Sequence, residues 1–433
     1  MPLRTIAVDF NSFFASCEQQ ENPRLRGRPV AVVPMLADTT CCIAASYPAK
    51  ALGVKVGTGV AEARLRCPGI QFVEARPAVY VRYHHRLLEI IESCIHVTAV
   101  KSIDEVECEL TATFAPREKA LAVARRIKSE VARLVGPCLT SSIGIAPNWL
   151  LAKLATDMQK PDGLTVLDDP DIPRKLLGLE LQDFLGIGPQ MDGRLRAHGI
   201  DTAAQLYAAT KAELRGVWGG VEGERMHARL RGDTVPLEVD QHQTVGHSHV
   251  LPPALRTAGL SFAVLHRLLQ KAALRLRHSG HYAGGLVAFV GYRDGSKWSD
   301  ELKFNETQDT FALTRTLNQL WARRPAGVRA RVPLQVGLVL NRLLAAAGHT
   351  PDLFEYESET THARLHQAVD TLNQTFGNGT VYLGGAFGAT DHAPMRIAFT
   401  RIPQPELEEI DESRERRLRS KLPGSPPAEL SDN

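Results

Sequence analysis

The sequence predicts a multidomain protein of mixed helix and sheet, either α/β or α+β, and three observations lead to this prediction. The 433 residues suffice for two to four domains of about 100–200 residues each, and 44% of them are hydrophobic, as in ordinary globular domains. Over the first 165 residues, short apolar runs alternate with amphipathic helical runs. A later, basic segment has the order β-α-β-β-α-β.

Strands rich in β-branched residues and helices with an apolar face account for the first part of the chain. The segment 3–9 predicts a buried strand that ends in an acid, and 28–35 predicts a second strand followed by a loop. The helix predicted at 149–160 stops at Pro161 and Gly163. The other predicted elements are strands at 106–110 and 141–146 and helices at 81–95 and 116–135.

Glycine-punctuated helices fill the middle of the chain, between a linker at 164–172 and an extended connector at 233–245. Within them, LGIGPQMDGRLRAHGI (185–200) resembles a helix-hairpin-helix, a motif that binds DNA without reading its sequence. Gly186 and Gly188 let the backbone approach a phosphate, which the N–H groups of the next helix would face. A glycine-rich connection without a ligand is the alternative interpretation.

The β-α-β-β-α-β segment is strongly basic. Residues 251–350 carry 14 Lys and Arg against 5 Asp and Glu, whereas the formal net charge of the whole chain is only +3. A polyanionic partner is one explanation, and a solvated basic face is the other. The predicted strands are 243–250, 285–293, 299–305 and 332–341, and the predicted helices are 260–278 and 310–322.

Cysteine usage and hydropathy exclude several classes of protein. The seven cysteines are odd in number and none forms a CxxC pair, which argues against a disulfide framework or a zinc site and for a reducing cytosol. The N-terminal MPLRTIAVDF has no signal-peptide pattern. No apolar run approaches the roughly 18 residues that a membrane crossing needs. We therefore expect a cytoplasmic protein that makes no membrane contact.

Two adjacent acids, Asp104 and Glu105, interrupt the strand-like run VKSIDEVECEL (100–110). Neighbouring residues of a strand point to opposite faces, so both acids can reach one site only at a strand end or a hairpin turn. Asp9 is a third acid at a strand end. Three carboxylates from two strands can hold two divalent cations roughly 3.5–4 Å apart, which is the arrangement of two-metal phosphoryl transfer. Solvated loop acids are the alternative that the spacing alone leaves open.

Four motifs occur in a specific order along the chain. They are DFNSFFASCEQQENPRLRGRPVAVV (9–33), AASYPAKALGVKVGTG (44–59), SIDE (102–105) and SSIGIAPNWLLAKLATDMQKPDGL (141–164). Together they resemble the Y-family of translesion DNA polymerases, of the bacterial DNA polymerase IV and V type. The resemblance extends over about residues 4–345 and is densest over the first 165.

The resemblance implies an α+β fold with a palm, small fingers, a helical thumb and a little finger. The implied boundaries are 1–165 for palm and fingers (fingers about 19–75), 166–232 for the thumb with its helix-hairpin-helix, 243–345 for the little finger, and 346–402 for a C-terminal extension. The charged, Pro-rich tail at 403–433 is expected to be disordered.

The motifs also imply roles for residues of the first domain. Asp9, Asp104 and Glu105 match the family's catalytic metal-binding carboxylates, and the backbone carbonyl of Phe10 matches a further metal ligand. The implied cofactor is a pair of Mg²⁺ ions, with Mn²⁺ as an alternative, because hard oxygen ligands favour both. Phe14 matches the steric gate, the ring that collides with a ribose 2′-OH. A plain core aromatic is the alternative for Phe14.

Three residues match the family's triphosphate-binding positions. Tyr47 can donate one hydrogen bond, and Lys50 and Lys160 can offset phosphate charge. Lys50 stands where Arg is commoner in the family, so a point charge replaces a bidentate fork. Asn11 and Ala44 are further departures, from the more frequent Asp and from Thr or Ser, respectively. These departures predict weaker nucleotide binding and leave the metal site intact.

The resemblance places DNA and a sliding clamp on the second half of the chain. The sheet of the little finger would lie along the DNA backbone, and its candidate phosphate contacts are Arg293, Lys297, Lys303, Arg329 and Arg331. In TPDLFEY (350–356), Leu353 and Phe354 resemble the apolar anchors of the peptide that docks on the β sliding clamp. A loop that packs these two side chains onto its own domain is the alternative.

The resemblance implies an error-prone, template-directed DNA polymerase that performs translesion synthesis in the SOS response to DNA damage. A primer 3′-OH would attack the α-phosphate of a dNTP on primer-template DNA, and the enzyme would be a monomer when free. The alternative is a non-catalytic scaffold that binds DNA and the clamp, although this chain keeps all three acids. A palm-type nucleotidyl cyclase fits the acids but neither the thumb nor the basic sheet.

Overall fold

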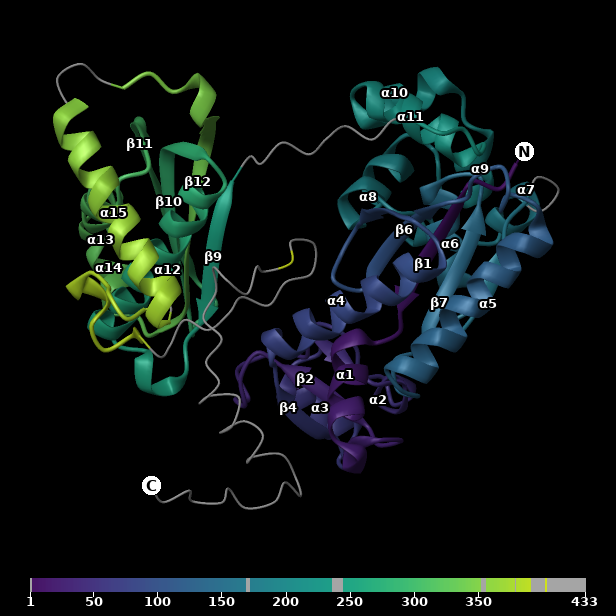
Figure 1. Ribbon diagram of the computed structural model, residues 1–433, viewed down its shortest axis with the longest axis horizontal. Helices are drawn as coiled ribbons and strands as arrows, with labels where there is room; N and C mark the ends of the chain where they lie inside the picture. The colour runs from purple at the N-terminus through teal and green to yellow at the C-terminus, as the bar shows by residue number, and fades with distance from the viewer. Residues whose placement is uncertain are drawn as a thin grey trace.

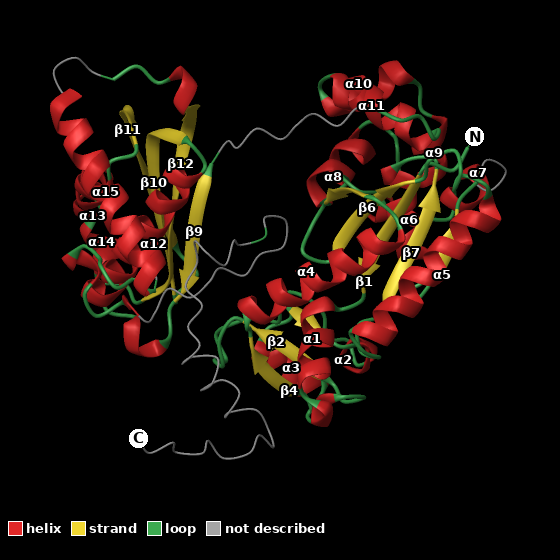
Figure 2. Ribbon diagram, viewed as in Figure 1, coloured by secondary structure: helices red, strands yellow, loops and turns green. Residues whose placement is uncertain are grey.

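The computed structural model describes residues 2–168, 172–235, 244–351, 356–377, 379–390 and 402. Elements β1 to α11 gather in one part of the molecule, and β9 to α15 gather in another (Figures 1 and 2). At one point the two parts are joined by a hydrogen bond, because Arg256 Nη2 donates to Thr39 Oγ1 at 2.9 Å. The described helices and strands confirm the predicted α+β class.

The first sheet has five strands in the order β5-β6-β1-β7-β8. Their bounds are β5 Val97–Val100, β6 Glu105–Glu109, β1 Thr5–Phe10, β7 Ser141–Ala146 and β8 Leu164–Val166. Strand β1 lies between β6 and β7, pairs antiparallel with both, and is buried along its whole length. A central buried strand is a rigid support for any residue at its end.

Three helices cover this sheet, and alternate residues of β1 pack against different ones. The buried side chains of Ile6 and Val8 pack in one core with α4 (Pro77–Cys94) and α5 (Arg117–Leu134), whereas Ala7 belongs to the core of α6 (Trp149–Met158). Helix α6 lies very close to β7, because a Cβ atom on Gly144 would come within 1.9 Å of the Ala152 carbonyl oxygen.

The run VKSIDEVECEL is a hairpin and not one continuous strand. Strand β5 ends at Val100, strand β6 begins at Glu105, and the two pair antiparallel. The acids therefore lie at a turn, which is the arrangement that lets neighbouring side chains reach one place. Helix α4 begins at Pro77, four residues before the predicted start at 81, since Pro is well suited to the first turn of a helix.

A smaller sheet lies beyond helix α1 (Phe13–Glu21), within the segment expected to form the fingers. Its order is β3-β2-β4, and its bounds are β3 Ala44–Ala45, β2 Val30–Val33 and β4 Gln71–Glu74. The short turn η1 (Pro23–Leu25) and helices α2 (Tyr47–Ala51) and α3 (Val60–Arg66) accompany it.

Short helices form the segment expected to be the thumb. They are α7 Ile172–Leu176, η2 Leu181–Asp183, α8 Pro189–Ala197, α9 Ala203–Ala208, α10 Lys211–Trp218 and α11 Val221–Leu230. Thr202 and Thr210 form capping boxes at the starts of α9 and α10. Before the GIG turn, the structure has the short 3-10 turn η2 where the helix-hairpin-helix pattern predicted a helix.

The second large sheet has four antiparallel strands in the order β11-β10-β12-β9. The strands are β9 Val245–Val250, β10 His281–Tyr292, β11 Lys297–Thr307 and β12 Pro333–Ala345, and the helices are α12 Ala258–His278, α13 Thr310–Ala322 and the single turn α14 Ala326–Arg329. The turn η3 (Pro253–Leu255) precedes α12. The predicted order β-α-β-β-α-β is confirmed; β10, β11 and β12 are longer than the apolar pattern indicated, and β9 is two residues shorter.

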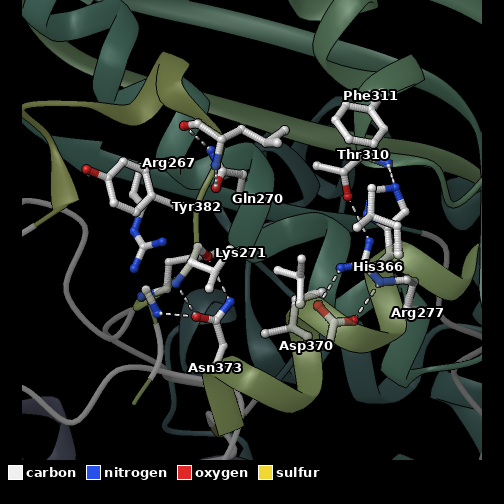
Figure 3. A pocket seen from close by; sticks show the side chains of 16 residues that line it. Arg267, Gln270, Lys271, Arg277, Thr310, Phe311, His366, Asp370, Asn373 and Tyr382 are labelled. Atoms are coloured by element: carbon white, nitrogen blue, oxygen red, sulfur yellow. Dashed lines mark hydrogen bonds and ion pairs between the residues drawn. The ribbon is translucent and has the colours of Figure 1, made fainter. Parts of the chain in front are cut away.

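The C-terminal extension adds a further layer to these helices. It contains η4 Ala346–Gly348, α15 Tyr356–Phe376 and η5 Gly384–Ala386. Arg277 on α12 forms two 2.8 Å bonds to Asp370 on α15. A cavity of about 230 Å³ lies between α12, the start of α13, and α15 (Figure 3). Its labelled Arg277, Asp370, Gln270 and Asn373 bond within the protein, so this polar lining is satisfied internally.

Among the helices that the structure describes, none has both the length and the apolar character needed to cross a bilayer.

Candidate active site

The three acids of the sequence prediction meet where β1 ends and β6 begins. In the antiparallel register, Asp9 is directly opposite Glu105. The next residue, Phe10, donates its backbone N–H to the carbonyl oxygen of Asp104 at 2.9 Å. Two paired strands thus bring together residues that are far apart in the chain. Asp9 is only 5% exposed, so its carboxylate is largely shielded from water.

The surroundings of the Asp104 carboxyl disfavour its ionised form. Burial, together with the nearby charges of Asp9 and Glu105, raises the pKa of the Asp104 carboxyl from 3.8 to about 6. A 2.5 Å hydrogen bond from Ser102 Oγ to Asp104 Oδ1 opposes this rise. A cation beside Asp104 would favour the ionised form, so the environment of Asp104 suits a site that binds positive charge.

A buried histidine anchors the turn that carries Asp104. Burial lowers the pKa of His84 on α4 to about 4, so its ring is neutral at physiological pH. Its Nδ1 lies 2.8 Å from the carbonyl oxygen of Ile103, which is the contact of an N–H donor with a carbonyl acceptor. Helix α4 therefore holds the backbone immediately before Asp104.

Two lysines, one on α6 and one in the loop after it, supply positive charge to the acids. Lys153 Nζ forms ion pairs with Asp9 and, at 3.0 Å, with Glu105 Oε1. Lys160 Nζ lies 2.8 Å from Asp9 Oδ2 and 2.7 Å from Asp157 Oδ1. Across the residues that the structure describes, no three Asp, Glu, His or Cys side chains are already arranged to hold a metal ion.

The sequence prediction missed Lys153 and Asp157. The available signal was KLATDMQK (153–160), in which the spacing of four and three would place Lys153, Asp157 and Lys160 on one face of a continuous helix. That pattern is also typical of a solvated helix. Only the packing of α6 against β1 shows that Lys153 faces Asp9 and Glu105.

Phe14 is a buried ring held by another ring. It is 3% exposed and stacks on Tyr80 with centroids 4.4 Å apart and an interplanar angle of 18°. The Tyr80 hydroxyl donates to Glu18 Oε1 at 2.8 Å, and the buried Arg76 pairs with the same carboxylate at 2.5 Å. The Phe14 ring therefore packs on Tyr80, which is itself fixed by the buried Arg76–Glu18 ion pair, so this packing restrains the position of Phe14.

The candidate phosphate-binding residues gather near the acids. Lys50 Nζ lies 4.6 Å from the centroid of the Tyr47 ring. Burial, and secondarily the charge of Lys160, lowers the pKa of Lys50. The pKa of Tyr47 is raised, chiefly by burial; the charge of Lys160 opposes this rise and the charge of Asp9 adds to it. Tyr47, Lys50 and Lys160 therefore share one electrostatic environment with Asp9, as a common site requires.

Asn11, a departure from the family pattern, has a structural role. Its Oδ1 accepts a 2.8 Å hydrogen bond from the backbone N–H of Asp162, and its Nδ2 donates to Ser142 Oγ at 3.0 Å. The side chain links the end of β1 to β7 and to the loop that carries Lys160. An amide can both donate and accept here, which an ionised carboxylate cannot do.

One of the two glycines of the expected helix-hairpin-helix has a backbone conformation that favours glycine. Gly186 has a φ of +90°, a left-handed conformation that favours glycine. Gly188 is the N-cap of α8, and neither glycine is buried. Leu195 and Ile200 are buried, as the apolar edge predicted.

The five basic residues of the expected DNA face divide into two groups. Arg293 is exposed just after β10, and Lys297 and Lys303 are exposed on the same face of β11. Arg329 donates to the Arg324 carbonyl oxygen at 2.6 Å, and Arg331 pairs with Asp294 at 3.2 Å. The last two thus have protein partners at the end of the sheet. Leu353 and Phe354, the expected clamp anchors, lie outside the described residues.

Comparisons with known proteins agree with this geometry. The impB/mucB/samB family matches residues 8–157, and the impB/mucB/samB family C-terminal domain matches residues 242–353. A DNA polymerase IV of Moorella thermoacetica is 35% identical over 389 residues, which is 87% of this chain and 94% of that protein. A DNA polymerase IV 1 of Halalkalibacterium halodurans is 30% identical over 420 residues, 91% of this chain and 96% of that protein.

Solved structures share the fold at lower identity. A Y-family DNA polymerase chimera, Dbh-Dpo4(243-245)-Dbh, has a TM-score of 0.67 at 24% identity, and the match covers 79% of this chain and 99% of the chimera. An insertion ternary complex of Dbh DNA polymerase has a TM-score of 0.53 at 24% identity over the same shares of the two chains. These likenesses show the architecture of palm, thumb and little finger.

Paired carboxylates at the meeting ends of two palm strands, followed by a helical segment and a basic four-stranded domain, define a nucleotidyltransferase of the DNA polymerase class. The chain belongs to the impB/mucB/samB family, the Y-family of DNA polymerases. It is a translesion DNA-directed DNA polymerase, and enzymes of this family use divalent metal ions.

Proposed function

We propose that Asp9, Asp104 and Glu105, with the backbone carbonyl of Phe10, hold two Mg²⁺ ions during DNA synthesis. The cross-strand pairing of Asp9 with Glu105, next to the Phe10–Asp104 backbone hydrogen bond, is the observation that carries this proposal. The donor set fits, because all four groups offer hard oxygen atoms, and the raised pKa of Asp104 would be relieved by a cation. When bound, the ions activate the primer 3′-OH and stabilise the charge of the leaving pyrophosphate.

The protein's own side chains would orient the dNTP. Lys50 and Lys160 would neutralise the triphosphate, and Tyr47 would donate a hydrogen bond to it. Phe14 would lie under the deoxyribose, where its supported ring leaves no room for a 2′-OH. Lys160 would exchange its present carboxylate partners for phosphate oxygens, which carry the same sign of charge.

Primer-template DNA would be held by the parts beyond residue 165. We infer a palm with fingers at 1–165, a thumb at 166–232 that holds a phosphate at Gly186 and Gly188, and a little finger at 243–345. Arg293, Lys297 and Lys303 would contact the DNA backbone from exposed positions. Arg329, which donates to a backbone carbonyl, and Arg331, which is paired with Asp294, would contact it alongside these protein partners. The enzyme would work in the cytoplasm, as a monomer when free.

Synthesis across a damaged template base tests the proposed function directly. With Mg²⁺ and dNTPs, the full chain is expected to extend a primer past an abasic site, and EDTA is expected to abolish extension. An undamaged template of the same sequence is the control. Primer-template binding without extension on either template would contradict the proposal and favour a non-catalytic scaffold.

We also propose that Leu353 and Phe354 dock on the β sliding clamp, and this can be tested separately. Replacing Leu353 and Phe354 together by Ala is expected to lower clamp-stimulated synthesis by roughly tenfold or more, because two apolar anchors of a hot spot are lost. Synthesis without the clamp should stay unchanged, since no catalytic, nucleotide or DNA contact is proposed for these two residues. Equal stimulation of the variant and the wild type by the clamp would remove the anchors from this role.

A further inference from the structure

Lys153 is the least exposed lysine at the carboxylate site, with 9% of its surface accessible. Its ammonium group contacts three carboxylates, those of Asp9, Glu105 (3.0 Å) and Asp157 (3.3 Å). A buried ammonium is costly unless it is paired, and a group of carboxylates is costly unless it is neutralised. Lys153 and the acids therefore stabilise one another.

The fold fixes the origin of this side chain. Helix α6 is held against the sheet, because its side chains Leu151 and Leu154 are buried in the core and the backbone of Gly144 on β7 lies against the Ala152 carbonyl with no room for a Cβ atom. Residue 153 follows directly, so the lysine stem starts from a rigid point and only its four methylenes can redirect the charge.

The ammonium group contacts an inner and an outer set of carboxylates at the same time. The inner set is Asp9 and Glu105, both of which are proposed metal ligands. The outer carboxylate is that of Asp157, which is one turn further along α6, has a side chain that is 44% exposed and also pairs with Lys160. Thr156 Oγ1, 3.4 Å from Nζ, offers a hydrogen-bond acceptor.

We propose that Lys153 is a positioning residue that balances the charge of Asp9 and Glu105 in the metal-free enzyme, and that it gives up these two contacts and keeps the one with Asp157 when divalent ions bind. This inference rests on the proposed metal role of these acids. Lys153 keeps the two carboxylates together in the absence of ions, and it competes with ions for the same oxygen atoms. Binding of a divalent ion to the free enzyme is therefore weakened by the lysine, and the metal-free fold is stabilised by it.

Mn²⁺ binding to the full chain without DNA or nucleotide tests this inference, with isothermal titration calorimetry as the measurement. Lys153→Gln is expected to bind Mn²⁺ roughly tenfold more tightly than the wild type, because a competing positive charge is removed. Lys153→Arg keeps the charge and is expected to stay near the wild type. Lys119→Gln, at an exposed position on α5, is the matched control for the loss of one charge and should bind like the wild type.

Thermal unfolding supplies the second readout. In EDTA, Lys153→Gln is expected to unfold about 3 °C below the wild type, and saturating Mn²⁺ should remove most of that difference. An equal loss with and without Mn²⁺, together with unchanged Mn²⁺ affinity, would overturn the inference and leave Lys153 as an ordinary packing residue. No Mn²⁺ binding by either protein would overturn the proposed metal site itself, and the inference with it.

Discussion

Asp104→Asn and Glu105→Gln are each expected to lower the rate of nucleotide incorporation by roughly 1,000-fold or more, because a neutral amide cannot hold a divalent ion as a carboxylate does. Both changes preserve size, and in Asp104→Asn the amide oxygen would still accept the hydrogen bond of Ser102 Oγ. Single-turnover extension of a labelled primer measures the rate. Primer-template affinity, measured separately, should change little, since neither acid is a proposed DNA contact.

The stability of Asp104→Asn separates lost chemistry from lost folding. Folded Asp104 has a pKa of about 6, above its ordinary value of 3.8, so the folded state binds the proton more tightly than the unfolded state does. The charged carboxylate therefore lowers stability as the pH rises from about 4 to 6, and this cost is fully present at neutral pH. We expect the variant to unfold at or above the wild-type temperature at pH 7.5.

An Asp104→Asn variant that incorporates nucleotides within tenfold of the wild-type rate would contradict the proposed role of Asp104.

Phe14→Ala is expected to lower the preference for dNTPs over rNTPs by roughly 100-fold, because the ring proposed to exclude a 2′-OH would be absent. The ratio of kcat/KM for a dNTP and the matching rNTP is the measurement. Removing a buried ring leaves a cavity beside Tyr80 and costs about 3–5 kcal/mol of stability, so Phe14→Leu serves as a milder second variant. It should relax discrimination partially.

Phe13→Leu is the matched control for this prediction. Phe13 is equally buried, and its centroid lies 5.9 Å from that of Phe14, but no interaction with the sugar is proposed for it. Its variant should keep the wild-type preference for dNTPs. Identical sugar discrimination in the wild type, Phe14→Leu and Phe14→Ala would remove Phe14 from the role of gate.

Local patterns were sufficient for most helices and strands of the second half. The apolar alternation over 281–307 and the helical spacing over 258–278 are properties of neighbouring residues, so the elements β10, β11 and α12 could be predicted within a few positions. The strand-like run at 100–110 was harder, because a hairpin of two short strands has the same β-branched composition as one long strand.

The identity of the acids was available from the order of four motifs, and so was the class of chemistry. The side chains that pair with the acids or pack against Phe14 could not be predicted in this way. Lys153 and Asp9 are 144 positions apart, and Phe14 stacks on a tyrosine from a different helix. The sequence by itself determined the class of enzyme and the candidate side chains for its chemistry, because residue types and short spacings are local. Only the tertiary structure decided which of them neutralise and support one another, because burial and pairing depend on how β1, α4 and α6 pack.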